Sequence, residues 1–124
     1  KKLNINFYGK KSRDYTLNML RKSDLLIFTS FRDLTATVTV EANINGIPVI
    51  AIKHCGFGYW LSQDHNLFIN AQSDLVKEFC KRIKNFKILK FKEKIKLQNY
   101  TNKVFSWEGK VNQLNLIYEQ KTAD

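Results

Sequence analysis

Two short segments in which every residue is apolar, Leu25–Phe28 and Val49–Ile52, constrain the fold of this chain more than any other feature. A strand with one face in water alternates apolar and polar residues, whereas a strand that is apolar throughout suits a parallel sheet covered by helices on both faces. The intervening segment 35–45 is followed by Gly46 and Pro48, residues that commonly follow the end of a helix. We therefore predict a strand, a helix and a second, parallel strand.

The helix in this unit conflicts with its own residue types. Thr37–Val40 is β-branched at every position, which favours a strand. The pairs Val38 with Ala42 and Val40 with Ile44 instead have the four-residue spacing of one helix face. Because this spacing agrees with the stop at Gly46, we predict a helix.

The rest of the chain continues the alternation of strands and helices. With 124 residues it can build one modest core, and residues 1–124 are expected to form a single domain. The order of elements is typical of an open α/β sheet. The further elements expected are a strand over Leu3–Phe7, a helix of about three turns capped by Ser12, a strand over Asn66–Ile69, a helix from the cap Ser73 to Lys84, and closing helices over 85–124 that end near Gln120.

Composition excludes several classes of protein. A hydrophobic content of 44% argues against disorder, and the apolar runs are far shorter than the roughly 20 residues of a membrane-spanning helix. Neither a secretion signal nor a C-x-x-C pair is visible, and Cys55 and Cys80 have no second ligand pair nearby. We expect a cytoplasmic protein without a disulfide framework or a metal site.

The charge is concentrated in one segment. The chain has 21 Lys and Arg against 11 Asp and Glu, a formal net charge of +10. Most of the excess lies in a basic strip within residues 81–96. Three interpretations of this strip stay open: it is a solvated helix face, it binds an anionic membrane surface at the inner face of the cell membrane, or it binds nucleic acid. Nucleic acid is disfavoured because no groove-reading motif accompanies the lysines. The strip consists of Lys81, Arg82, Lys84, Lys87, Lys90, Lys92, Lys94 and Lys96, with Glu93 as the one acid among them.

Residues 23–51 resemble a known donor-site signature. The segment has an Asp-containing apolar strand that ends in Thr29–Ser30, two acids separated by seven residues at Asp33 and Glu41, and then Gly46-x-Pro48 before an apolar strand. This pattern resembles family 4 retaining glycosyltransferases with the GT-B fold. Those enzymes usually have Glu at the first acid, Gly where this chain has Leu34 and Pro where it has Ala36. The ending Phe105–Ser106–Trp107, followed by Leu114 and Tyr118, resembles the closing helices of the same family, with Trp107 expected to pack.

The resemblance spans approximately residues 3–118 and implies an incomplete C-terminal half of a bacterial GT-B enzyme. The chain would then be the back part, about four strands, of the Rossmann-like domain that binds a nucleotide-diphosphate sugar. The N-terminal acceptor domain would be missing, and the isolated fragment inactive. The implied acceptor of the parent protein is a cell-envelope polysaccharide, a lipopolysaccharide or a lipid-linked glycan, and no cofactor is implied. Leu3–Phe7 is then expected beside Leu25–Phe28 or paired with another copy, which predicts a homodimer through an exposed sheet edge.

Each residue of the candidate site has a chemical reason. In open α/β sheets ligands bind beyond the carboxyl ends of the strands, where helix N-termini present free N–H groups. The carboxylate of Glu41 suits the two adjacent hydroxyls of a ribose, and the stretch Thr35, Ala36 and Thr37 suits a diphosphate. Asp33 is then expected to contact the donor sugar. The alternative is that Asp33 and Thr35 cap the helix and Glu41 is a solvated acid.

A second loop completes the predicted site. Gly56, Phe57 and Gly58 follow the Val49–Ile52 strand, where the family has a glycine-containing loop beside the donor. Glycine allows the backbone to approach a ligand closely. A tight strand-to-helix turn accounts for these glycines equally well.

Overall fold

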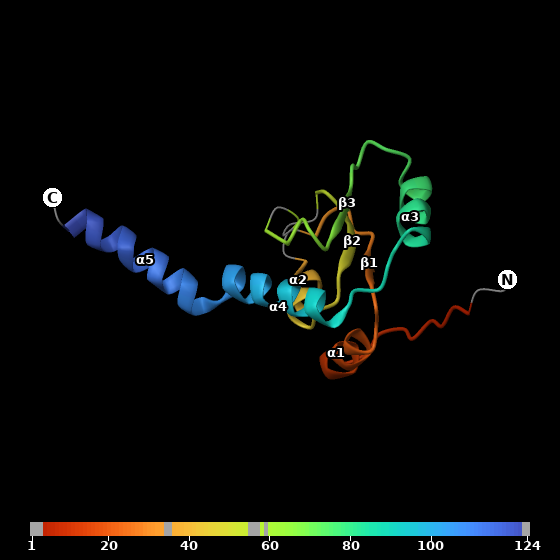
Figure 1. The fold of residues 1–124 in the computed structure, drawn as a ribbon, viewed down its shortest axis with the longest axis horizontal. Helices are drawn as coiled ribbons and strands as arrows, with labels where there is room; N and C mark the ends of the chain where they lie inside the picture. Colours follow the sequence, from red (N-terminus) through yellow and green to blue (C-terminus); the bar gives the residue numbers. More distant parts are fainter. Residues whose placement is uncertain (1–3, 34–35, 55–57, 59, 123–124) are drawn as a thin grey trace.

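The computed structural model describes residues 4–33, 36–54, 58 and 60–122. This part of the chain forms five helices and three strands (Figure 1). In chain order they are α1 (Arg13–Arg21), β1 (Leu26–Phe28), α2 (Thr37–Ile44), β2 (Val49–Ile52), β3 (Leu67–Ile69), α3 (Leu75–Lys84), α4 (Phe91–Phe105) and α5 (Trp107–Thr122).

The strands form one parallel sheet in the order β1-β2-β3, which confirms the predicted α/β class. Ile27 is paired with Ile50, and Ile52 with Ile69. All four residues of β2 are buried, as its apolar sequence predicts. Segment 37–44 is helical, so the helix spacing and the Gly46 stop prevail over the β-branched residue types.

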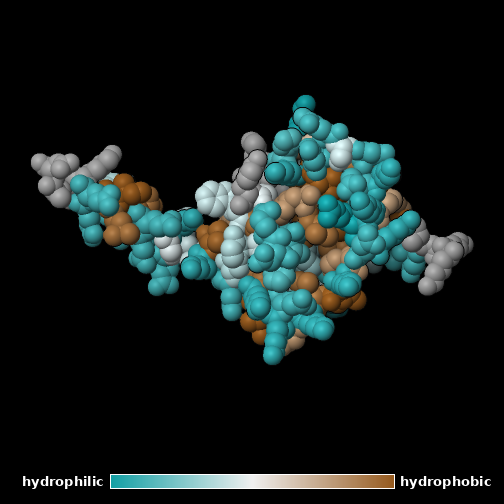
Figure 2. Space-filling view, turned by 45° about the horizontal axis from the view of Figure 1, so that its top comes forward, coloured by the Kyte–Doolittle hydropathy of each residue, from teal (hydrophilic) through white to brown (hydrophobic). Residues whose placement is uncertain are grey.

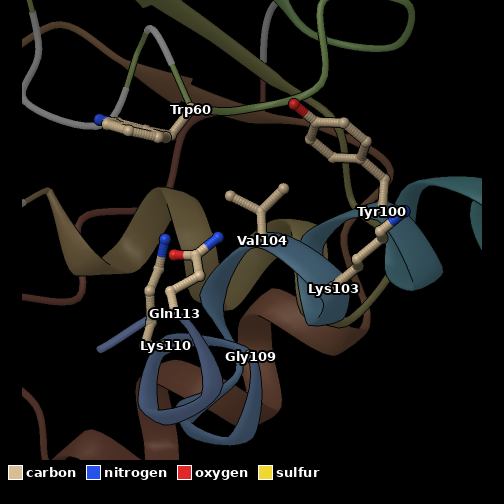
Figure 3. Close-up of a pocket in the computed structure, with 7 residues that line it drawn as sticks. All are labelled: Trp60, Tyr100, Lys103, Val104, Gly109, Lys110 and Gln113. Atoms are coloured by element: carbon tan, nitrogen blue, oxygen red, sulfur yellow. The ribbon is translucent and has the colours of Figure 1, made fainter. Parts of the chain in front are cut away.

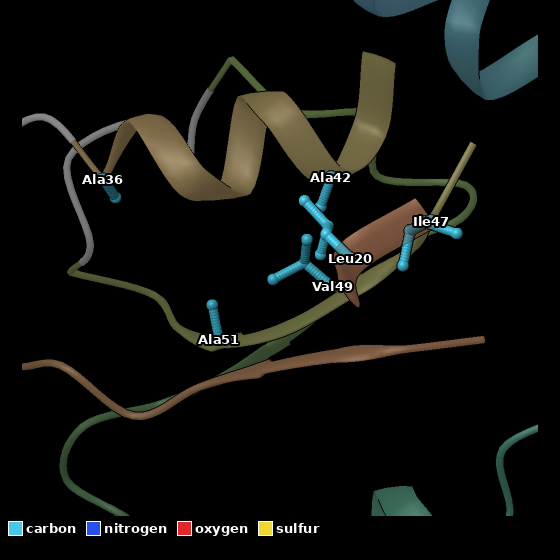
Figure 4. Packing of buried hydrophobic residues seen from close by; sticks show 6 residues of the cluster. All are labelled: Leu20, Ala36, Ala42, Ile47, Val49 and Ala51. Carbon is cyan, nitrogen blue, oxygen red and sulfur yellow. The ribbon is translucent and has the colours of Figure 1, made fainter. Parts of the chain in front are cut away.

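Small residues let α2 lie close to the sheet. One buried cluster joins α1, α2 and β2, and its side chains point from α2 and from β2 toward the same space (Figure 4). Three members are alanines, Ala36, Ala42 and Ala51, so little side-chain volume separates helix from strand. The other members are Leu20, Ile47 and Val49, with Leu26, Phe28 and Phe68 packed against them.

The two faces of β1 are covered unequally, which corrects the sequence prediction for this strand. Leu26 and Phe28 face α2, whereas Ile27 points to the opposite side, is exposed, and lines a groove beside α3. This all-apolar strand has only one face covered, because α3 packs on β3 and leaves a groove between itself and β1.

Gly46 ends α2 in a left-handed conformation, with φ of 74°. The N–H of Ile47 donates to the carbonyl of Ala42 at 2.9 Å, and the N–H of Gly46 donates to that of Asn43 at 3.0 Å. These are the two hydrogen bonds of a Schellman motif. The glycine also lies against α4, since a Cβ placed on it would be 3.0 Å from the Cβ of Lys94.

Replacing Gly46 with alanine should therefore destabilise the protein for two reasons. The left-handed backbone costs about 1–2 kcal/mol for a residue with a Cβ, and the contact with Lys94 adds to that cost. Urea unfolding followed by circular dichroism would measure the change. Gly9→Ala is the matched control, because Gly9 has φ of 62° but nothing within 4 Å of the added Cβ. Equal losses in the two variants would contradict the contribution of the α2–α4 contact.

A buried pair of asparagines joins α2 to the segment before β3. The side-chain amides of Asn43 and Asn66 bond each other reciprocally at 3.0 and 2.8 Å. The Oδ1 of Asn66 also accepts the N–H of Val49 at 2.8 Å, and its Nδ2 donates to the carbonyl of Ser62 at 2.8 Å. Both asparagines are buried, so this network satisfies polar groups that have no access to water.

The strand predicted over Leu3–Phe7 does not form beside β1 in the described chain, so that alternative is wrong, whereas pairing with another copy stays a prediction. Residues 4–7, the described part of this segment, have no strand assignment and pair with no other strand in the described chain. The side chain of Phe7 is 94% exposed. Alternation indicates a chain suited to pairing, but a strand also needs a neighbouring strand edge, and here residues 4–7 lead away from β1 (Figure 1).

Capping side chains set the helix boundaries. Ser12 accepts the N–H of Tyr15 at 3.3 Å and begins α1, as predicted. The predicted cap Ser73 is wrong, because Asp74 accepts the N–H of Lys77 at 3.1 Å and its carboxylate is the stronger acceptor. Residues 85–90 are not helical.

The first of the two closing helices begins later than the segment predicted for them, at Phe91, and the second begins at Trp107. The Glu93 Oε2 accepts the N–H of Lys90 at 2.7 Å at the start of α4, and Ser106 Oγ accepts the N–H of Gly109 at 3.1 Å at the start of α5. These acceptors satisfy N–H groups that have no partner inside their own helix.

The last helix extends away from the sheet and contacts mainly α4 (Figure 1). Trp107 is 86% exposed, so the expectation that it packs is wrong for the described chain, which offers it no apolar surface. Hydrophobic side chains appear on the outer part of α5 (Figure 2), including Leu114, Leu116 and Ile117. Among the described residues, no helix combines the length and apolarity needed to cross a bilayer.

Candidate functional site

The helix α2 begins after the loop that follows the carboxyl end of β1. The carboxylate of Asp33 accepts the N–H of Ala36 at 2.8 Å, and the carbonyl of Ala36 accepts the N–H and the hydroxyl of Thr39 at 2.8 and 2.7 Å. Ala36 is 1% exposed, so the backbone at this point is packed against the core. This bond shapes the turn before α2, whose N-cap is Ala36 without a side-chain capping bond, so the contact of Asp33 with a donor sugar stays a prediction.

The first turn of α2 presents groups suited to an anion. Thr37 is the first helical residue and is exposed, and the backbone N–H groups of a first turn have no partner inside their own helix. These N–H groups and the positive end of the helix dipole attract a negatively charged ligand. Thr35, predicted to share this role, lies outside the described residues.

Glu41 lies about 6 Å further along the helix axis, one turn beyond Thr37. Its side chain is 23% exposed and forms an ion pair with Arg13, the first residue of α1. Glu41 is therefore partly buried and paired with α1, and its contact with a ribose stays a prediction. Arg13 was not predicted, because its partner is 28 residues away and no local spacing connects the two.

A second contact fixes α1 against the other end of α2. The Nε of Arg21 donates to the Oδ1 of Asn45 at 3.2 Å, and the Nδ2 of Asn45 donates to the carbonyl of Glu41 at 2.7 Å. Two arginines on α1, at its first and its last residue, therefore contact α2. These contacts hold α1 along α2 at two positions.

The glycine loop can be placed only at its end. Gly56 and Phe57 lie outside the described residues. Gly58 is buried, and its carbonyl accepts a hydrogen bond from the Nε2 of Gln63 at 3.1 Å. The expected contact of this loop with a donor stays a prediction.

A cavity of about 410 Å³ that the sequence did not predict opens between the second half of α4, the start of α5 and Trp60 (Figure 3). The Nζ of Lys110 lies 5.3 Å from the centroid of the Trp60 ring, a cation–π distance. None of the predicted site residues lines this cavity. It is lined by Trp60, Tyr100, Lys103, Val104, Gly109, Lys110 and Gln113.

Comparison with protein families places this geometry in context. The family model described as "Glycosyl transferases group 1" matches residues 1–104. The chain belongs to the group 1 glycosyl transferases. In this group 1 glycosyl transferase the match includes all three strands, the helices α1 to α3 and nearly all of α4, and it ends before α5. The Asp33–Glu41 segment and its partner Arg13 therefore lie within the matched part. No curated protein and no solved structure matches this chain.

Proposed function

We propose that this group 1 glycosyl transferase binds a nucleotide-diphosphate sugar at the start of α2. The proposal rests on two features of one helix. The N-terminus of α2 attracts an anion, and one turn later Glu41 presents a carboxylate that is paired with Arg13. A diphosphate and the ribose attached to it need two such groups at neighbouring positions. Membership of the glycosyl transferase family supports this use of the site over nucleic-acid binding without enzymatic activity.

Each contact has a defined chemical role in this proposal. The diphosphate accepts hydrogen bonds from the N–H and the hydroxyl of Thr37, next to Ala36, and Thr35 is assigned to the same ligand from its place in the sequence. The ribose hydroxyls donate to the Glu41 carboxylate, whose Oε1 is bonded to Arg13. A carboxylate has about four lone-pair sites, so Asp33 can keep its bond to Ala36 and also accept from a sugar hydroxyl. The loop Gly56–Gly58 approaches the same donor, and no metal or cofactor is assigned.

The wider activity follows from the resemblance of residues 23–51 to family 4 retaining enzymes. We propose that the parent protein is bacterial and transfers the sugar in the cytoplasm to a cell-envelope polysaccharide, a lipopolysaccharide or a lipid-linked acceptor. Acceptor binding is assigned to a separate N-terminal domain of that parent. The chain studied here is then expected to bind a donor without transferring its sugar.

A titration with UDP and GDP tests the donor site directly. Nitrogen–proton NMR spectra should show shifts in residues 33–41 for the preferred nucleotide. Glu41→Gln should weaken binding by about 10- to 100-fold, because a hydrogen bond to a charged group contributes about 1.5–3 kcal/mol. The control is Glu108→Gln, which removes the same charge from an exposed site on α5. Binding that is unchanged in Glu41→Gln, or shifts confined to other regions, would contradict the assignment.

A further inference from the structure

The helix α3 keeps much of its surface uncovered. None of its residues is buried, and Val76 is 76% exposed. With 3.6 residues per turn, its apolar residues fall on one side and its lysines on the adjoining side. The apolar side consists of Leu75, Val76, Phe79, Cys80 and Ile83, and the lysines are Lys77, Lys81 and Lys84.

The apolar side of α3 borders an open groove. The groove has a volume of about 470 Å³ and runs between α3 and the edge strand β1. Ile27 and Phe31 line it from the side of β1, and both are exposed, as is Ile83 on α3. Apolar surface is thus continuous from β1 across the groove to α3. Scattered exposed apolar residues are common in proteins, but a contiguous group such as this one favours a binding surface.

The lysines of α3 gather in a hollow beside this groove. A cavity of about 360 Å³ is lined by Lys77, Lys81 and Lys84, together with Cys80 and Asn85. Cys80 lines the groove as well, so the two features adjoin along the helix. The acid on this helix, Glu78, lies 3.8 Å from Arg82, and none of the three lysines forms an ion pair within the described chain. The hollow therefore presents three lysines, and neither Glu78 nor Asp74, the cap of α3, lines it.

We propose that α3 docks this domain on an anionic phospholipid bilayer. Lys77, Lys81 and Lys84 contact the phosphate headgroups, while Val76 and Ile83 enter the boundary between headgroups and acyl chains. The adjoining apolar surface favours a bilayer over nucleic acid. The phosphates of a nucleic acid would contact only the lysines, and the apolar residues would stay in water. The inference concerns where the domain is held and does not depend on the donor site.

Vesicle sedimentation with the whole 124-residue chain tests the proposal. The chain should bind vesicles of phosphatidylcholine with phosphatidylglycerol at low salt, bind more weakly at high salt, and not bind phosphatidylcholine alone. Lys77→Gln, Lys81→Gln and Lys84→Gln combined should weaken binding roughly a hundredfold, about fivefold for each lysine near the surface. Val76→Asp should also abolish binding, and an acid in the first turn of a helix favours folding.

A second lysine triple provides the matched control. Lys92→Gln, Lys96→Gln and Lys103→Gln combined remove the same charge from exposed positions of α4 and should leave binding nearly unchanged. An equal loss in the two triples would overturn the proposal in favour of a general charge effect. Failure to bind anionic vesicles at low salt would overturn it as well. Binding of a DNA duplex in place of the vesicles would assign the lysines to nucleic acid.

Discussion

Replacing Asn66 by alanine is expected to lower the free energy of unfolding by about 3 kcal/mol. The change removes four hydrogen bonds at a residue that is 2% exposed, and it leaves the N–H of Val49 and the Oδ1 of Asn43 buried without these partners. Each buried polar group left unsatisfied costs about 1–3 kcal/mol. Because the amides of Asn43 and Asn66 bond each other, the loss should exceed that of an ordinary surface substitution.

Urea unfolding of the variant against the natural chain measures this loss. Asn99→Ala is the control, since Asn99 is exposed on α4 and its replacement should change stability by less than about 0.5 kcal/mol. Asn66→Asp separates the two halves of the network, because a carboxylate accepts from Val49 and Asn43 but cannot donate to the Ser62 carbonyl or to the Oδ1 of Asn43. Similar losses for Asn66→Ala and Asn99→Ala would show that the amide network contributes little.

Leu97→Ala is expected to cost about 2–5 kcal/mol, the range for removing most of a fully buried leucine. Leu97 is 0% exposed, and with Thr101 it forms the buried side of α4, which packs against α2. The cavity left by the smaller side chain cannot collapse easily between two helices. Because α2 carries Glu41, loosening this contact should also shift the NMR signals of residues 37–44.

The control for this cavity is Leu116→Ala on α5, where the leucine is exposed and the same atoms are removed from water-accessible surface. Its unfolding free energy should change by less than about 0.5 kcal/mol. A comparable loss in both variants would mean that α4 is not held to α2 through Leu97.

Most elements near the centre of the fold could be predicted because their signals are local. The apolar run at Val49–Ile52 indicates a covered strand, and the spacing within residues 37–44 together with Gly46 indicates a helix that ends there. The strand over Leu3–Phe7 shows where this reasoning fails. An alternating pattern describes which side chains share a face, but it carries no information about whether a neighbouring edge lies within reach.

In the candidate site, too, some residues could be predicted from the sequence and others could not. Its acids, Asp33 and Glu41, were indicated by the resemblance to a donor-site signature and the helix that carries Glu41 by its spacing, whereas Arg13 was not predicted. The pairing of Asn43 with Asn66 was not predicted either, since these residues are 23 positions apart and belong to different parts of the fold. Side chains distant in sequence meet only when helices and strands have packed, so no local pattern identifies the pair.

The sequence by itself therefore determined the α/β order of elements, the burial of β2, the helix between residues 37 and 44, and the resemblance to a donor site. Tertiary structure alone decided that α1 holds Glu41, that two asparagines bridge α2 to the segment before β3, and that one face of β1 stays open beside α3. The physical reason is that periodicity and capping are properties of neighbouring residues, whereas partners and coverage depend on how distant elements pack together.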